Sequence, residues 1–232
     1  MWSPDGAYIT FMSSRDSNYE LYIMDTLGGS LSNLSDEPVA EDGNGVWSPH
    51  GTHVVFSSTR TNGNSELFLI DVTNGSLEQL TYNESYDGFA AWSPDGTQIV
   101  FTTGRDDNME IYRMDVARGE DSLVNLTHQP YGDNAPSWSP DGRYIVFFSD
   151  RDGNNEIYLM DADGSNQRRI TNHFADDTYP LWLPDGSGIL FTSNRSGDED
   201  LYLQAMQEGI PVGEPRNMTN NPAADRYGAL RP

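Results

Sequence analysis

The sequence predicts an all-β fold built from five repeated units. Tryptophan recurs at spacings of 45, 45, 46 and 44 residues, and a period of roughly 20 to 50 residues is typical of solenoids and propellers. Each tryptophan opens a similar phrase of turn residues followed by β-branched and aromatic residues, and no convincing helical periodicity interrupts it. The five tryptophans are Trp2, Trp47, Trp92, Trp138 and Trp182.

Four short strands are predicted in each repeat. A run with small residues ends at the tryptophan, as in residues 88–92, and suits an inner strand. A Pro-Asp-Gly turn follows, in which Pro fixes φ and Gly accepts a positive φ. It leads to a β-branched and aromatic second strand such as 144–148. A turn over 151–155 precedes a third strand at 156–161, and a brief fourth strand ends at 170–171.

Four antiparallel strands per repeat predict one blade of a β-propeller, and five repeats predict five blades in a single domain over residues 1–232. The segment 225–232 aligns with the start of the chain. It is therefore predicted to supply the inner strand that the first blade lacks, which closes the ring and removes open sheet edges. The alternative is a piece of a longer array with six or more blades. The predicted repeats cover approximately residues 2–46, 47–91, 92–137, 138–181 and 182–229.

The charge and the cysteine content exclude several functions. The formal net charge is -23, from 36 acidic and 13 basic residues, so nucleic acid is a poor partner because phosphate contacts need clustered cations. With no cysteine, disulfides, thiolate metal sites and a cysteine nucleophile are excluded. No apolar run approaches the length of about 18 residues that a membrane-spanning helix needs, so membrane insertion is not expected.

The repeated phrase, W-S-P-D-G-x-x-I-x-F-x-S-x-R-D-G-N-x-E-I-Y-x-M-D, resembles the WD-like repeat of the TolB family of β-propellers over essentially the whole chain. Departures from it include His50, Thr61, Leu183 and Ser196, and the last repeat departs most. The resemblance covers the propeller repeat and does not include the amino-terminal domain of full TolB proteins, so a role specific to their translocation system is not expected from it. The resemblance implies a binding or scaffold module outside the cytoplasm. Similar repeats also occur in peptidases and polysaccharide lyases, so fold alone does not decide function.

An aspartate stands five residues before each tryptophan, or before its equivalent Leu230. Propeller geometry would place these aspartates at one mouth of the central channel, where converging carboxylates suit Ca²⁺ or a basic ligand group. Alternatively each one pairs with a regularly spaced arginine that braces the loops, because a guanidinium binds a carboxylate bidentately. The aspartates are Asp42, Asp87, Asp133, Asp177 and Asp225. The arginines are Arg15, Arg60, Arg105, Arg151 and Arg195.

The candidate ligand contacts lie at a variable position, three residues before the tryptophan of a repeat or before Leu230. Aromatic rings beside carboxylates suit sugars or peptides, and packing of the rings across the channel is the alternative. Ala135 occupies this position in one repeat. The candidate contacts are Asn44, Phe89, Tyr179 and Tyr227.

No residue pattern predicts catalysis. The recurring acids of the turns, such as Asp95 and Asp71, suit turn hydrogen bonds, and Glu66 and its equivalents are interpreted as turn caps. The sequence contains no nucleophile elbow, zinc motif or phosphate loop. The predicted function is a non-catalytic module that binds a protein, peptide or glycan at the channel mouth. No cofactor is expected apart from the candidate Ca²⁺. The alternatives are a self-assembling structural protein and, with least support, a hydrolase or lyase.

Overall fold

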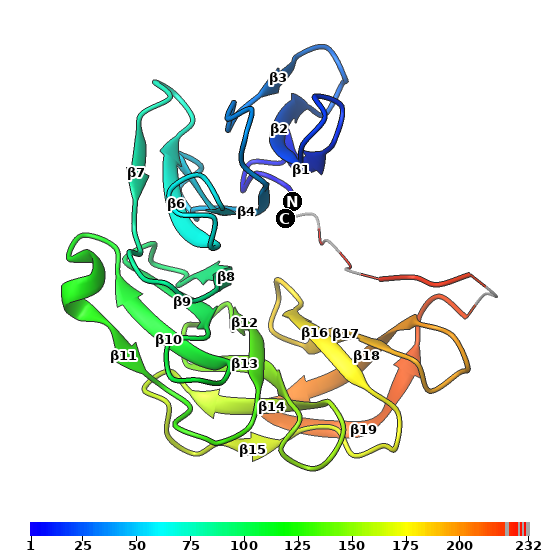
Figure 1. Ribbon diagram of the computed structural model, residues 1–232. Coiled ribbons are helices and arrows are strands. Elements are labelled where there is room, and N and C mark those ends of the chain that lie inside the picture. The colour runs from blue at the N-terminus through cyan, green and yellow to red at the C-terminus, as the bar shows by residue number, and fades with distance from the viewer. Residues whose placement is uncertain (221–222, 227, 229, 231–232) are drawn as a thin grey trace. The chain divides into compact units, whose positions relative to one another are not determined.

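The structure is a computed structural model that describes residues 1–220, 223–226, 228 and 230. Five antiparallel sheets follow one another along the chain, and nearly every strand pairs with its neighbours in sequence (Figure 1). The all-β prediction is confirmed, and within the described residues the only helix is one 3-10 turn at Gly119–Ser122. The chain divides into two compact units, residues 1–107, 112–124 and 229–232, and residues 108–111 and 125–228.

The strand bounds repeat with a nearly constant pattern of three six-residue strands and one short strand. The first sheet contains β1 (Tyr8–Ser13), β2 (Glu20–Asp25) and β3 (Leu31–Asn33). The second contains β4 (Asp42–Trp47), β5 (His53–Ser58), β6 (Glu66–Asp71) and β7 (Leu77–Gln79). The third contains β8 (Asp87–Trp92), β9 (Gln98–Thr103), β10 (Glu110–Asp115) and β11 (Val124–Asn125). The fourth contains β12 (Asp133–Trp138), β13 (Tyr144–Ser149), β14 (Glu156–Asp161) and β15 (Arg168–Arg169). The fifth contains β16 (Asp177–Trp182), β17 (Gly188–Ser193), β18 (Asp200–Gln207) and β19 (Ile210–Asn217).

The first sheet has three strands where four were predicted per blade. Trp2 forms one isolated antiparallel bridge to Ile9, at the position where Trp47 pairs with Val54 in the second sheet. The segment predicted to complete this sheet, 225–232, lies partly outside the described residues. Five blades and ring closure stay predictions, as does the single domain.

The fourth strand of the fourth sheet is shorter than the sequence suggested. β15 ends at Arg169, although the Ile170 amide still donates to the Ile157 carbonyl at 2.7 Å. At the next residue a side chain takes the place of the backbone partner, because the Thr171 hydroxyl accepts from the Ile157 amide at 2.9 Å and donates to a buried glutamate. The end of this strand is thus decided by a side chain, which strand propensity does not describe.

Strand β6 shows how the core is built within the first unit. Leu67 and Leu69 pack in a cluster with Ile99 and Phe101 of β9. Phe68 and Ile70, which point to the opposite face, pack in a second cluster that holds Leu21 of β2. Both faces of the strand are covered by sheets, so five of its six residues are buried. The burial of these apolar faces is the main force that stabilises the unit.

The turn between the first two strands forms as its residues predict. The Gly96 amide donates to the Ser93 carbonyl at 2.9 Å with Gly96 at φ 70°. Asp95 Oδ1 accepts from the Ser93 hydroxyl at 2.6 Å and from the Thr97 amide at 3.0 Å. These bonds confirm a turn role for Asp95 and lower its pKa, with the Ser93 hydroxyl as the largest cause.

Candidate functional site

Four of the predicted arginines lie against the aspartate that begins the first strand of the same sheet. The carboxylates have no exposed side-chain surface, whereas the arginine side chains are 11% to 18% exposed. Each pair joins the turn after the second strand to the start of the first strand. The N···O distances are 2.8 Å for Arg60–Asp42, 3.2 Å for Arg105–Asp87, 2.8 Å for Arg151–Asp133 and 2.5 Å for Arg195–Asp177.

Each guanidinium also lies over two aromatic rings. The Arg60 Cζ atom is 5.2 Å from the centre of the Phe56 ring and 5.1 Å from that of Phe68, and its Nε donates to the Ser58 hydroxyl at 2.8 Å. The rings supply a cation-π attraction that a carboxylate pair alone lacks. Arg15 has the same two kinds of contact, with Tyr22 at 4.3 Å and with the Ser13 hydroxyl. Sequence reasoning missed the rings, although the F-x-x-x-R spacing that places them recurs in every repeat.

The aspartate amides form a second periodic contact. The Asp42 amide donates to the Tyr19 carbonyl at 2.7 Å, and the Asp177 amide donates to the Asn155 carbonyl at 2.8 Å. The Asp225 amide makes the equivalent bond to the Glu199 carbonyl at 2.6 Å. The backbone register of the repeat therefore continues past the last sheet to Asp225.

Burial changes the acidity of two of these aspartates. It raises the pKa of Asp133 above its ordinary value, although Ser149 and Arg151 act in the opposite direction. It raises the pKa of Asp42 likewise, against the effects of Ser58 and Arg60. Desolvation penalises the charged carboxylate more than the arginine compensates for it. Each pair is therefore a buried constraint on its loops.

A buried glutamate opens the third strand of the first four sheets, and it caps a loop amide and in addition accepts from a side-chain hydroxyl beside the fourth strand. Glu66 accepts from the Thr81 hydroxyl at 2.6 Å and from the Asn83 amide at 2.7 Å. Thr81 follows the fourth strand, so the glutamate ties that strand to the third. Burial raises the pKa of Glu66, and the charge of Asp87 adds to this rise. The sequence signal was the Ser or Thr that ends the fourth strand, as at 170–171, which was assigned only to the strand end. The other glutamates are Glu20, Glu110 and Glu156, each of which accepts from a Ser or Thr hydroxyl.

The candidate ligand residues occupy a β-bulge in the first strand of the second, third and fifth sheets, and the fourth sheet has the same bulge. The ladder between β8 and β9 shifts register between Gly88 and Ala91, and Phe89 has φ 49°. Tyr179 has φ 51° and Asn44 has φ 54°. A positive φ is uncommon for bulky residues, and a bulge redirects the side chain out of the regular alternation. Tyr227 lies outside the described residues.

These side chains are partly open to solvent. Asn44 is exposed, whereas Phe89 and Tyr179 are half-buried. Phe89 lies 6.3 Å from the Tyr86 ring, and Tyr179 meets the Phe148 ring edge-on at 5.5 Å. The rings thus pack on neighbours in their own unit and are half-buried. Ala135, at the same position, is buried.

The loops that lead into the first strands expose large apolar side chains, a feature that the sequence reasoning missed. Val39 and Phe174 are each 89% exposed, Tyr82 is 62% exposed and Tyr131 is 46% exposed. They lie two to five residues before the aspartates, among acids such as Glu37 and Asp176. Each unit therefore presents apolar side chains on an acidic surface at this end of its sheets.

The described residues contain no group of three or more His, Asp or Glu side chains placed to hold a metal ion. The calcium site expected at the aspartates remains a prediction. No helix in the described part of the chain is both long and apolar enough to cross a bilayer.

Comparison with known proteins places the chain in a family. The model of the TolB beta propeller domain matches residues 1–134 and 124–221. A TolB structure from Agrobacterium tumefaciens is 29% identical, with a TM-score of 0.80 over 93% of this chain and 78% of that one. TolB from Acinetobacter baumannii is 24% identical, with a TM-score of 0.77, and is matched over 89% of this chain and only 52% of its own length.

Enzymes share the architecture at lower identity. An oligogalacturonate lyase in complex with manganese is 19% identical, with a TM-score of 0.73 over 97% of this chain and 65% of that one. At this identity the likeness concerns the fold alone. No curated protein matches the chain. The family match covers well over half of the sequence, and the chain therefore belongs to the TolB beta propeller domain family.

Proposed function

We propose that this chain is a non-catalytic binding module that recognises a protein or peptide through the loops at the aspartate end of its sheets. The observation that carries the proposal is that the same Arg–Asp pair recurs in several sheets while the loops next to it differ. The exposed residue of such a loop is Val39 in one sheet and Phe174 in another. Contiguous exposed apolar patches mark interaction sites, and the proposal is that these loop residues contribute to such a patch.

The charge of the loops suggests which partner they suit. Phe174 lies close in sequence to Asp176, and Val39 lies between Glu37 and Glu41. A partner with apolar residues beside lysine or arginine complements such a surface, because opposite charges speed encounter and exclude acidic competitors. A glycan partner would depend on the aromatic rings at Phe89 and Tyr179 instead.

The absence of a catalytic role is part of the proposal. The buried acids that we described, such as Asp133 and Glu66, are engaged by Arg151 and Thr81, as structural acids are. Testing the chain for cleavage of oligogalacturonate and of peptide amides checks this. Turnover that a single acidic substitution abolishes would contradict the proposal.

The partner is sought by probing peptide and glycan arrays with the labelled chain. We expect binding to cationic apolar peptides, with loss of that binding in Phe174→Ser. The matched control is Leu27→Ser, because Leu27 is 96% exposed but lies in the turn after β2, at the opposite end of its sheet. Equal loss in both variants, or binding to glycans alone, would overturn the proposed peptide site.

Two further expectations belong to this proposal. We propose an extracytoplasmic location, on the basis of the family, and cell fractionation of the source organism tests it.

The alternative of a self-assembling structural protein predicts that the mass measured by light scattering increases with concentration. A constant monomer mass would favour the binding module.

A further inference from the structure

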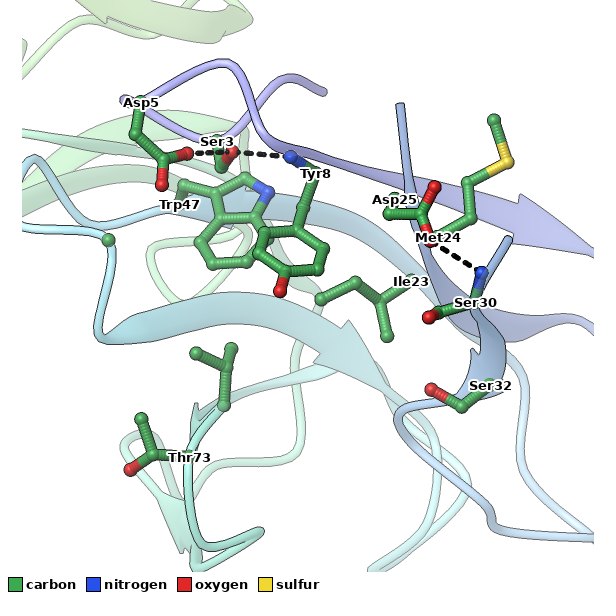
Figure 2. Close-up of a pocket in the computed structure, with 12 residues that line it drawn as sticks. Ser3, Asp5, Tyr8, Ile23, Met24, Asp25, Ser30, Ser32, Trp47 and Thr73 are labelled. Carbon is green, nitrogen blue, oxygen red and sulfur yellow. Dashed lines mark hydrogen bonds between the residues drawn. The ribbon is translucent and has the colours of Figure 1, made fainter. Parts of the chain in front are cut away.

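A cavity of about 370 Å³ lies between the first and second sheets, within the first unit. Its wall includes Tyr8 and Trp47, whose rings stack with centroids 6.4 Å apart (Figure 2). Tyr8 is 42% exposed although it belongs to a strand. The cavity is at the small end of the range for ligand pockets, roughly 300 to 1,000 Å³, and suits one side chain or one turn of a chain.

The cavity is acidic. Asp5 and Asp25 line it, and its lining contains no arginine or histidine. Asp5 Oδ1 accepts from the Ser3 hydroxyl and from the Ala7 amide, and these bonds hold the pKa of Asp5 below its ordinary value. The Gly29 amide is the largest cause of the lowered pKa of Asp25. Both carboxylates are therefore anionic at neutral pH.

The second unit contains an equivalent position in which arginine and a turn cover the tyrosine. Tyr144 pairs with Asp161 as Tyr8 pairs with Asp25. The Nε atom of Arg143 lies 2.6 Å from Asp141 Oδ2, and its Cζ lies 5.4 Å from the centre of the Tyr144 ring. A second guanidinium, that of Arg168, lies over the same ring at 5.7 Å.

A hairpin turn completes the cover of Tyr144. Strands β18 and β19 are eight residues long, and their turn carries Gly209 at φ 78°. A Cβ atom added at Gly209 would be 2.8 Å from Tyr144 Cζ, so the backbone lies directly against the ring. Arg168 Nη2 donates to the Gly209 carbonyl at 3.0 Å. The position thus accommodates a glycine turn and guanidinium groups together.

Around Tyr8, none of these three covers is present among the residues that the structure describes. Ala7 stands where the second unit has Arg143, two residues after the turn aspartate. Ser32 stands where it has Arg168, as the pairing of Ser32 with Ile23 and of Arg168 with Leu159 shows. The second sheet has a short turn after Asp71, where the fifth sheet extends its hairpin. The carboxylate of Asp5 and the ring of Tyr8 are present, and the cavity lies where the second unit has its two arginines and the glycine turn.

We propose that this cavity binds an arginine side chain presented on a glycine-containing turn of a partner protein. The guanidinium pairs with the carboxylate of Asp5 and stacks on Tyr8, as Arg143 does with Asp141 and Tyr144. A guanidinium suits this pair of groups because its plane stacks on a ring while its edge donates to a carboxylate. The proposal is independent of the loops at the aspartate end, so either can fail alone.

The test is a titration of the ¹⁵N-labelled full chain with the peptide acetyl-Ser-Gly-Arg-Gly-Ser-amide, followed by NMR. We expect saturable shifts of the Trp47 indole and Gly51 amide signals, both of which belong to the cavity wall. The same peptide with citrulline in place of arginine keeps the shape but lacks the charge. We expect it to bind about tenfold more weakly or worse, since the ion pair and the cation-π contact are lost.

Substitutions within the chain provide the decisive comparison. Ala7→Arg supplies an internal guanidinium, as in the second unit, and should abolish the peptide-induced shifts. Thr97→Arg is the matched control, because the third sheet has Asp95 but Gln98 in place of the tyrosine, and it should leave binding unchanged. Tyr8→Leu should weaken binding and keeps the result interpretable if Ala7→Arg lowers the melting temperature.

Three outcomes would overturn the proposal. The first is the absence of shifts at Trp47 and Gly51 at millimolar arginine peptide. The second is equal affinity for the citrulline peptide, which would remove the role of the charge. The third is a response of the same signals to maltotriose but not to the arginine peptide, which would assign the cavity to a sugar.

Discussion

Arg151 and Asp133 are joined by two hydrogen bonds from one nitrogen, Nη2, to both carboxylate oxygens, at 2.8 and 2.9 Å. The aspartate begins β12 and the arginine follows β13, so the contact joins the two ends of one hairpin. Asp133 is fully buried.

Replacement of Arg151 by alanine should lower the free energy of unfolding by about 3 kcal/mol, because a buried carboxylate is left without its counter-charge. For a chain of this size that corresponds to a fall of roughly 6 to 12 °C in the melting temperature. The control is Arg169→Ala, whose pair with Asp152 is more than a third exposed and should contribute less than about 1 kcal/mol. Calorimetry measures both, and equal effects would contradict the brace role.

The raised pKa of Asp133 predicts a pH dependence of stability. The unfolded carboxyl titrates near 3.8, and burial raises the folded value above it. Between the two values the folded state binds more protons, so this group stabilises the fold as pH falls through that window and destabilises it as pH rises. Urea unfolding at a series of pH values upward from about 4 should therefore show a smaller loss of stability with rising pH in Asp133→Asn than in the wild-type chain.

The turn acids should act with the opposite sign and serve as the comparison. Hydrogen bonds from Ser93 and Thr97 lower the pKa of Asp95, so its contribution is present above the unfolded value of 3.8 and disappears as pH falls below it. Asp95→Asn should thus alter the stability profile at the acid end and leave its slope above pH 5 or so unchanged. An identical change of slope in the two variants would contradict both assignments.

Thr81→Val should destabilise the second sheet by about 2 kcal/mol. The hydroxyl donates to Glu66 and accepts from the Leu67 amide. Its removal leaves the buried Leu67 amide without that acceptor and takes one donor from the buried Glu66, which keeps the Asn83 amide. Thr97→Val is the matched control, because that hydroxyl meets only the exposed turn at Asp95. Urea unfolding of the two variants checks the difference, and comparable losses would show that burial of the glutamate is unimportant.

Removal of metal should leave the thermal transition unchanged. Asp42, Asp87 and Asp177 already have a guanidinium within 3.2 Å, which neutralises the charge that a calcium ion would require. Calorimetry with a chelator and with added Ca²⁺, together with elemental analysis, checks this. A transition that falls with the chelator and recovers with Ca²⁺ would support the cation site in place of the arginine brace.

Much of the fold could be predicted because each repeat carries its own local signals. The Pro-Asp-Gly turn at Asp95 depends on contacts within five residues, so the sequence reveals it directly. Because the pattern is repeated five times, an atypical residue in one repeat does not obscure it. The predicted bounds of the third strand, 156–161, therefore agree with the structure to the residue. The bulge at Phe89 had no such signal, because its positive φ is imposed by pairing with β9 on residues of ordinary type.

The sequence by itself determined the all-β class, the strand order and the family, since these follow from periodicity and turn chemistry within about 45 residues. Only the tertiary structure decided that Glu66 ties two strands together, that Arg60 lies over two rings, and that Tyr8 is uncovered where Tyr144 is covered. These contacts depend on distances between side chains far apart in the chain or on neighbouring sheets. Packing sets such distances, and residue types in a linear pattern do not.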